Sequence, residues 1–191
     1  MLTYYPTLNT KTQAIMTKGY LKSVNSQFEY YKSLGEKTFS QLNDDELFWQ
    51  YREESNSVAI IVKHLSGNMK SRWTDFLTTD GEKEWRQRDN EFRADIKTRS
   101  EMLEKWNQGW ECLFRALDSI SIYDLESKTI YIRNEEHSIT EAINRQLAHY
   151  PYHIGQIVFI GKMISKDWKS LSIPKGGSDE FNEGMFSKPK Q

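Results

Sequence analysis

Two of the four histidines in the chain, His149 and His153, lie four residues apart. Residues with this spacing project from the same face of a helix, so both imidazoles can reach one ion. Imidazole binds zinc, nickel, copper and iron, and two ligands on one rigid helix lose little entropy on binding. The spacing alone leaves two interpretations equally open, a metal site or a chance pair on the surface or in the core.

The surroundings of this pair favour the metal site. A seam with intervals of three and four residues, typical of a helix face that points into a bundle, consists of Gln146, His149, His153, Gln156 and Ile160. Inward-facing polar side chains are costly unless a cavity, water or an ion satisfies them. The HYPYH string resembles the HExxH motif of zinc proteases. Its second residue is Tyr rather than Glu, so the general base of that class is missing.

A third ligand could come from either of the other two histidines. His64 lies in the most apolar segment, where a lone histidine is usually a hydrogen-bonded core residue. It becomes a candidate ligand because an inward-facing pair already needs one. Gly67 would let another helix approach closely, and Asn68 could support a ligand or contact a substrate. His137, beside two glutamates at a predicted helix start, is interpreted as a solvated turn residue. The residues alone favour His64 only slightly.

Four long helices are predicted to position these residues, because apolar side chains recur every three or four positions. Thr98 with Glu101 and Ser138 with Glu141 fit capping boxes, and Pro151 should bend the last helix. The predicted helices run from about Thr17 to Leu42, from Val58 after an N-cap at Asn56 or Ser57 to the Asp80-Gly81 turn, from near Thr98 through Leu117, and from Ser138 through Gly161.

The connections between these helices indicate the topology. A highly charged segment of about 20 residues, TTDGEKEWRQRDNEFRADIK, joins the second and third helices, and that length lets the two run parallel. The stretch KTIYIRNEEHS alternates apolar and polar residues around an Asn-Glu turn candidate, which allows a small β-hairpin before the last helix. We therefore expect an all-α fold in a single domain over 1–191, with an irregular tail from about 170.

The charged connection over 79–97 is either an ordered lid or a solvated structural loop, and charge runs are usually the latter. If it crosses the end of the bundle that carries the histidines, Arg72, Arg86, Arg88 and Asp89 could bind anionic groups or fix the loop by salt bridges. The structural role is ranked first.

Several classes of function are disfavoured. The formal charge of −1 argues against binding nucleic acid, and the longest apolar runs, VAIIV and IVFI, are too short to cross a membrane. The start, MLTYYPTLNTK, does not have the pattern of a secretory signal. The single cysteine, Cys112, cannot form an internal disulfide, which fits the cytoplasm, and GWECLF supplies no base to activate it as a nucleophile. Nucleotide-binding glycine motifs and GxSxG are absent.

Two longer strings, HLSGNMKSRW and HYPYHIGQI, resemble the DinB-like superfamily of bacterial four-helix proteins. HLSGNMKSRWTDFLTTDGEKEWRQRDNEF and SLSIPKGGSDEF look like an uncharacterised subgroup of that superfamily. The resemblance covers nearly the whole chain. It implies an up-down-down-up four-helix bundle with a crossover between the second and third helices. It also implies a divalent metal held by His64, His149 and His153. Its members include transferases that join bacillithiol, mycothiol or glutathione to electrophiles, and an isomerase.

The expected function is that of a cytoplasmic metal-dependent enzyme, such as a low-molecular-weight-thiol S-transferase acting on a small molecule. The alternatives are a metal-dependent hydrolase and a non-enzymatic stress protein that binds metal or a small ligand. Zinc or nickel is the expected cofactor, because three imidazoles differ from the usual site of two histidines and one carboxylate for iron. Asn68, Gln146 and Gln156 are the candidate supporting or substrate-contacting residues. Homodimer formation is left open.

Overall fold

A computed structural model describes the backbone of residues 10–189 and the side chains of residues 19–189. The chain is mostly helical with one small antiparallel sheet of two strands, as expected. The stretch considered above as a leader lies almost entirely outside the described residues. The elements are α1 (Thr10–Phe39), α2 (Asp44–Phe48), α3 (Val58–Trp73), η1 (Arg88–Phe92), α4 (Arg99–Ser119), α5 (Asp124–Ser127), β1 (Thr129–Ile132), β2 (Glu135–Ser138), α6 (Ile139–Ile164) and α7 (Ser178–Phe186).

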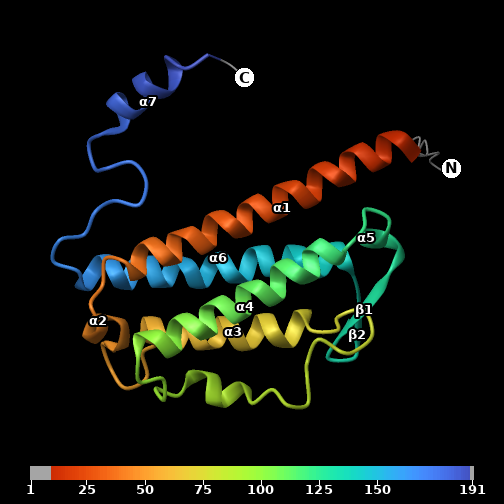
Figure 1. The fold of residues 1–191 in the computed structure, drawn as a ribbon, viewed down its shortest axis with the longest axis horizontal. Helices are drawn as coiled ribbons and strands as arrows, with labels where there is room; N and C mark the ends of the chain where they lie inside the picture. Colours follow the sequence, from red (N-terminus) through yellow and green to blue (C-terminus); the bar gives the residue numbers. More distant parts are fainter. Residues whose placement is uncertain (1–9, 190–191) are drawn as a thin grey trace, which may run out of the picture.

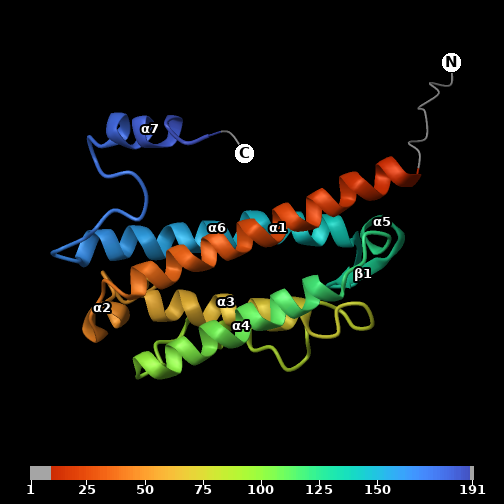
Figure 2. The same ribbon diagram turned by 45° about the horizontal axis from the view of Figure 1, so that its top comes forward.

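The long helices α1, α3, α4 and α6 lie side by side along one axis (Figures 1 and 2). The most extensive contacts between elements are those of α3 with α4 and of α1 with α6. Figure 1 shows that the chain runs through α3 and α4 in the same direction and through α1 and α6 in the opposite one. The segment between α3 and α4 therefore returns along the whole length of α3, and this segment contains η1.

Side-chain caps begin the helices where the sequence predicts them. Both bonds of the capping box at α6 are present, with Ser138 N donating to Glu141 at 2.7 Å and Glu141 N donating to Ser138 at 3.2 Å. At α4, Thr98 accepts from Glu101 N at 3.1 Å, but the Glu101 carboxylate takes the backbone N–H of Lys97 instead. The second capping box is thus only half formed, and its cap still begins the helix at the predicted residue.

Three helix boundaries differ clearly from the prediction, and one of them is the start of α1, at Thr10 rather than near Thr17. α3 ends at Trp73 rather than near Asp80, because Thr74 has an extended backbone and Asp75 follows it with a positive φ of 46°. Phe76 lies beyond this break yet is buried, so it contributes to the core from a turn and not from a helical face. α1 ends at Phe39, and the chain then turns through a hydrogen bond from Leu42 N to Phe39 O.

The predicted hairpin is present as β1 and β2, but its turn lies one residue earlier than expected. Arg133 and Asn134 occupy the turn, with φ angles of 56° and 62° as in type I′ hairpins. The Asp80 carboxylate accepts the backbone N–H groups of both turn residues, at 2.9 and 2.7 Å. The crossover segment after α3 is thereby tied to the hairpin that precedes α6.

The expectation of an irregular tail is wrong for residues 178–186, which form α7. This helix begins at Gly177 without a side-chain cap, and none of its residues is buried. It lies apart from the long helices in Figures 1 and 2. Three glycines in and before this segment argued against a helix, because glycine has a low helix propensity. No buried side chain of α7 compensates for this low propensity.

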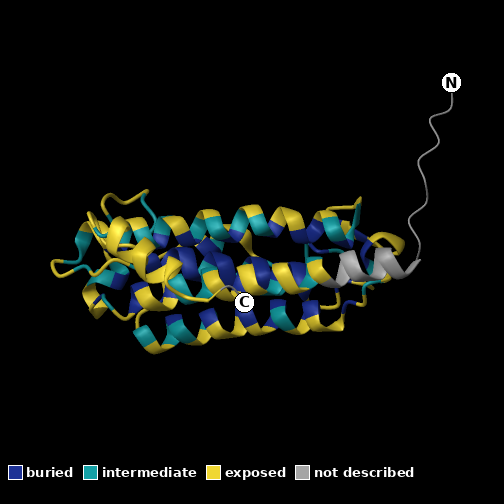
Figure 3. Cartoon of the chain, turned by 90° about the horizontal axis from the view of Figure 1, so that it is seen from above, coloured by how far each residue is buried: buried dark blue, intermediate teal, exposed yellow. Residues whose placement is uncertain are grey.

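The core fills the space between the long helices, whose buried residues face one another in Figure 3. Phe28 of α1 contacts both Trp110 of α4 and Tyr150 of α6, with ring centroids 6.3 and 5.8 Å apart. Trp73 Nε1 donates to the Tyr150 hydroxyl at 3.1 Å, and that hydroxyl donates to Asn68 at 3.2 Å. Because Tyr150 follows His149, these bonds fix the register of α6 against α3. Within the described residues, no helix combines the length and apolarity required to cross a membrane.

Candidate metal centre

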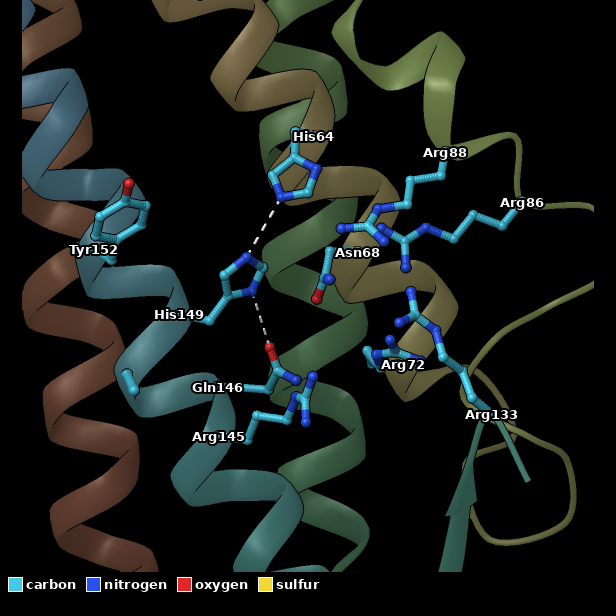
Figure 4. A pocket seen from close by; sticks show the side chains of 11 residues that line it. His64, Asn68, Arg72, Arg86, Arg88, Arg133, Arg145, Gln146, His149 and Tyr152 are labelled. Carbon is cyan, nitrogen blue, oxygen red and sulfur yellow. Dashed lines mark hydrogen bonds between the residues drawn. The ribbon is translucent and has the colours of Figure 1, made fainter. Parts of the chain in front are cut away.

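The structure brings together three of the four histidines. His64 from α3 meets His149 and His153 from α6, although 85 residues separate the first two. The Nε2 atom of His149 lies 3.4 Å from Nε2 of His64 and 3.1 Å from Nε2 of His153. All three Nε2 atoms therefore point at one small volume, and Figure 4 shows His64 and His149 facing each other across it.

The other nitrogen of each ring has its own oxygen partner. His64 Nδ1 lies 2.9 Å from Glu91 Oε2, His149 Nδ1 lies 3.3 Å from Gln146 Oε1, and His153 Nδ1 lies 2.8 Å from Gln156 Oε1. Since these oxygens accept, each ring carries its proton on Nδ1 and leaves the Nε2 lone pair free. Histidines that bind metals are oriented in the same way by an oxygen behind the ring. The donor set and its supports fit a divalent ion held by the three Nε2 atoms.

The electrostatics of the cluster keep the two α6 rings neutral. Burial, together with the neighbouring rings of His153 and His64, lowers the pKa of His149 to about 4. Burial also lowers the pKa of His153, against the opposing effect of its bond to Gln156. Neutral imidazole is the form that binds metals, so His149 and His153 need no deprotonation near pH 7.

Glu91 is the supporting residue that the sequence did not reveal. It lies in η1, is buried, and accepts from Arg86 Nε at 2.8 Å and from Arg86 Nη2 at 3.0 Å in addition to His64. Burial alone would raise the pKa of this carboxyl, but the hydrogen bonds from His64 and Arg86 hold it below its ordinary value. The next residue, Phe92, stacks on the His64 ring with centroids 4.8 Å apart. The apolar residues inside the charge run, Phe92 among them, were the signal that this segment packs against the bundle.

Ion pairs hold the crossover over the cluster, which agrees with the structural role ranked first in the case of Arg72 and Arg86, whereas Arg88 is exposed and has no ion pair among the described residues. Arg86 pairs with Glu91, and Arg72 pairs with Glu82 at 3.2 Å. Asp89 is exposed, and no ion pair involves it among the described residues.

Gly67 provides the space for Glu91. A Cβ atom at this position would lie 2.7 Å from the Glu91 carboxyl carbon, so the glycine admits the η1 carboxylate and not a second helix as the sequence suggested. Gly67→Ala is expected to displace Glu91 and to weaken zinc binding by about 10- to 100-fold, the usual effect of losing a partner behind a ligand. Gly155→Ala, where a Cβ meets nothing within 4 Å, is the matched control on α6. Equal zinc affinities of the two variants in a chelator competition titration would contradict this role.

The remaining predicted residues lie as follows. Asn68, Gln146 and Gln156 adjoin the cluster, and the first two line a cavity of about 460 Å³ beside His64 and His149.

His137 lies in β2 opposite Ile130 and outside the cluster. It is half-buried, and its Nε2 has no hydrogen-bond partner among the described residues, so the interpretation as a solvated turn residue is wrong. Packing of the hairpin buries this side chain.

Cys112 is buried in α4, where its thiol contacts Met69 O at 3.9 Å and Thr74 Oγ1 at 3.5 Å. Neither contact is a base that could form a thiolate. Cys112→Ser is therefore expected to retain zinc affinity and any turnover of the wild type, as measured by titration and by product formation. Loss of turnover with intact fold and metal content would make the thiol a nucleophile after all.

Searches among curated proteins and among solved structures each returned no match to the chain. A family model described as "Protein of unknown function (DUF1572)" matches residues 15–177, which include the three clustered histidines and Glu91. Since this match covers most of the sequence, the chain belongs to the DUF1572 family.

Proposed function

We propose that this chain binds one divalent metal ion through His64, His149 and His153 and uses it to transfer a low-molecular-weight thiol to a small electrophile. One observation carries the proposal: three Nε2 atoms converge while each Nδ1 bonds an oxygen. Chance clusters of histidines have no reason to share one tautomer and one direction.

The proposal includes membership of the DinB-like superfamily and its up-down-down-up four-helix bundle. The parallel course of α3 and α4, joined by the long crossover, supports this topology. The three histidines that the resemblance assigns as metal ligands also lie together in one cluster, which supports the assignment. We also place the protein in the cytoplasm, where low-molecular-weight thiols are kept reduced.

Zinc or nickel is the proposed cofactor, because the ligand set consists of imidazoles without a carboxylate. Three protein ligands would leave room for a thiol or a water molecule, and a bound ion would supply Lewis-acid activation of either one. The chain's own residues hold the rings in place: Glu91 anchors His64, and the two glutamines anchor the α6 histidines.

The cavity lining favours a thiol over water as the nucleophile. Within the described part of the chain, no aspartate or glutamate lines the cavity beside the cluster. The nearest carboxylate, Glu91, already accepts from His64 and Arg86 and is not free to act as a base. Hydrolysis usually relies on a general base, whereas a thiol, with an ordinary pKa near 8.5, loses its proton far more readily than water. Asn68 has no acceptor for its amide nitrogen among residues 19–189 and is placed to orient the substrate.

The test is conjugation of monochlorobimane by the zinc- or nickel-loaded full chain, with bacillithiol, mycothiol and glutathione supplied in separate reactions. The thiol sulfur forms a bond to the chloromethyl carbon, chloride leaves with the electron pair of the broken bond, and the thiol proton passes to solvent. We expect turnover that depends on one of these thiols and disappears in His153→Ala, while Cys112→Ser retains it. Loss of the electrophile without any thiol would favour the hydrolase, and no turnover with any thiol would favour a binding protein; both results contradict the transferase.

A further inference from the structure

Arginine is the commonest residue type lining the cavity beside the histidine cluster. Five of its lining residues are arginines, whose guanidinium ends point toward the middle of the cavity from both sides in Figure 4. They come from three separate parts of the chain, namely α3, the crossover with its 3₁₀ helix, and the hairpin with the start of α6. These residues are Arg72, Arg86, Arg88, Arg133 and Arg145.

Two carboxylates lie behind these arginines. Glu82 contacts Arg72 at 3.2 Å, Arg86 at 3.6 Å and Arg133 at 3.2 Å, so one carboxylate is shared by three guanidinium groups. Glu91 contacts Arg86 but is also bonded to His64. Within the described residues no ion pair involves the other two arginines. The five arginines around the cavity thus have only two directly paired carboxylates between them.

Arg72 shows most clearly that a partner is missing. Its side chain is only 6% exposed, yet its Nε and Nη1 atoms have no hydrogen-bond partner among the described residues. Burial lowers the pKa of its guanidinium, which means that the site disfavours the charge it carries. Buried charges are normally paired and fully hydrogen-bonded, because an unsatisfied one is costly. An anion in the cavity would compensate this group and its neighbours.

We propose that this cavity binds the oxyanion groups, phosphate or carboxylate, of a small-molecule substrate. The planar guanidinium group presents paired donors that match such oxygens, and bidentate bonds of this kind are among the stronger hydrogen bonds in proteins. A cavity of about 460 Å³ is of the size that takes a small metabolite. The side chains of Arg72 and Arg86 are buried, and the other three arginines are more exposed. Because several guanidinium groups surround one cavity, the site suits a ligand that carries more than one negative charge.

The position of the cavity then orients the substrate. His64, His149 and Asn68 line the same cavity as the arginines. A ligand held by its oxyanion groups would therefore present its uncharged end to the histidine cluster. This part of the inference rests on the proposed function, whereas oxyanion binding by itself does not.

The test is calorimetric titration of the untagged full chain, freed of metal with a chelator, using inorganic phosphate, pyrophosphate and malate in parallel. The cavity variant is Arg88→Gln/Arg145→Gln, which breaks no ion pair of the described residues. Its matched control is Arg52→Gln/Arg115→Gln, which removes the same charge from exposed positions outside the cavity. We expect the wild type to bind one equivalent of at least one probe, the cavity variant to bind at least about tenfold more weakly, and the control to stay within about twofold.

The outcomes separate this inference from the proposed function. If the phosphates bind more tightly than malate, the site prefers phosphate groups, and if malate binds more tightly, it prefers carboxylates. Both results support the site. Equal affinity of the cavity variant and the control, or no binding of any probe by the wild type, overturns it. Zinc stoichiometry is measured on the same proteins. If the cavity variant binds zinc normally but has lost the anion, both sites stand. If the wild type binds the anion but no zinc, only the metal proposal fails.

Discussion

Replacing any one of His64, His149 or His153 by alanine is expected to weaken zinc binding by orders of magnitude. Each ring supplies one of three converging Nε2 atoms, so its removal leaves a two-ligand site that loses both a bond and its geometry. A competition titration against a chromophoric zinc chelator measures the effect directly.

His137→Ala is the matched control for these variants, because it removes the remaining histidine of the chain from a position outside the cluster. It is expected to bind zinc as the wild type does. Circular dichroism of all four variants should remain that of a helical protein, since the aromatic and aliphatic core between the long helices needs no metal to pack. Loss of zinc by His137→Ala with retention by His64→Ala would move the site to the hairpin.

Arg86→Met is expected to lower the free energy of unfolding of the metal-free chain by about 3–5 kcal/mol, as measured by urea denaturation. The Arg86 side chain is 2% exposed and forms two hydrogen bonds to Glu91, whose side chain is 8% exposed. Removing the guanidinium group leaves a buried carboxylate with only His64 as a partner. Breaking one side of a buried pair costs far more than removing both sides.

Two further variants test this explanation. Arg88→Met changes an exposed arginine two residues away and is expected to alter stability by less than about 0.5 kcal/mol. Adding Glu91→Leu to Arg86→Met should recover part of the lost stability, because no unpaired charge then remains. If Arg86→Met were no less stable than Arg88→Met, the ion pair over the cluster would not hold the crossover in place.

The sequence predicted those features that depend on neighbouring residues. The helical segments follow from apolar residues at intervals of three and four, and the start of α6 follows from Ser138 and Glu141, which make both bonds of their capping box. The His149 and His153 pair, with the two glutamines, was visible because all four lie on one helix. Their hydrogen bonds pair residues three apart, a spacing that a single helix determines.

Features that depend on tertiary contacts were not predictable in the same way. Glu91 is 27 residues from His64 in a charged segment, and nothing local separates it from the other acidic residues there. The burial of His137 depends on how the hairpin packs, and the end of α3 depends on the backbone conformations of Thr74 and Asp75. The error at α7 has the opposite cause: its glycines disfavour a helix locally, and no buried contact signalled that one would form.

Equilibrium dialysis of the untagged full chain against zinc, with the bound metal counted by mass spectrometry, is the most direct test of the metal site. Three histidines that share one tautomer and one direction should hold one ion per chain in the wild type and in His137→Ala. The same dialysis should leave His64→Ala without tightly bound zinc. A wild type that retains no zinc, or a His64→Ala variant that retains one ion per chain, would contradict the assignment of this cluster as a metal centre.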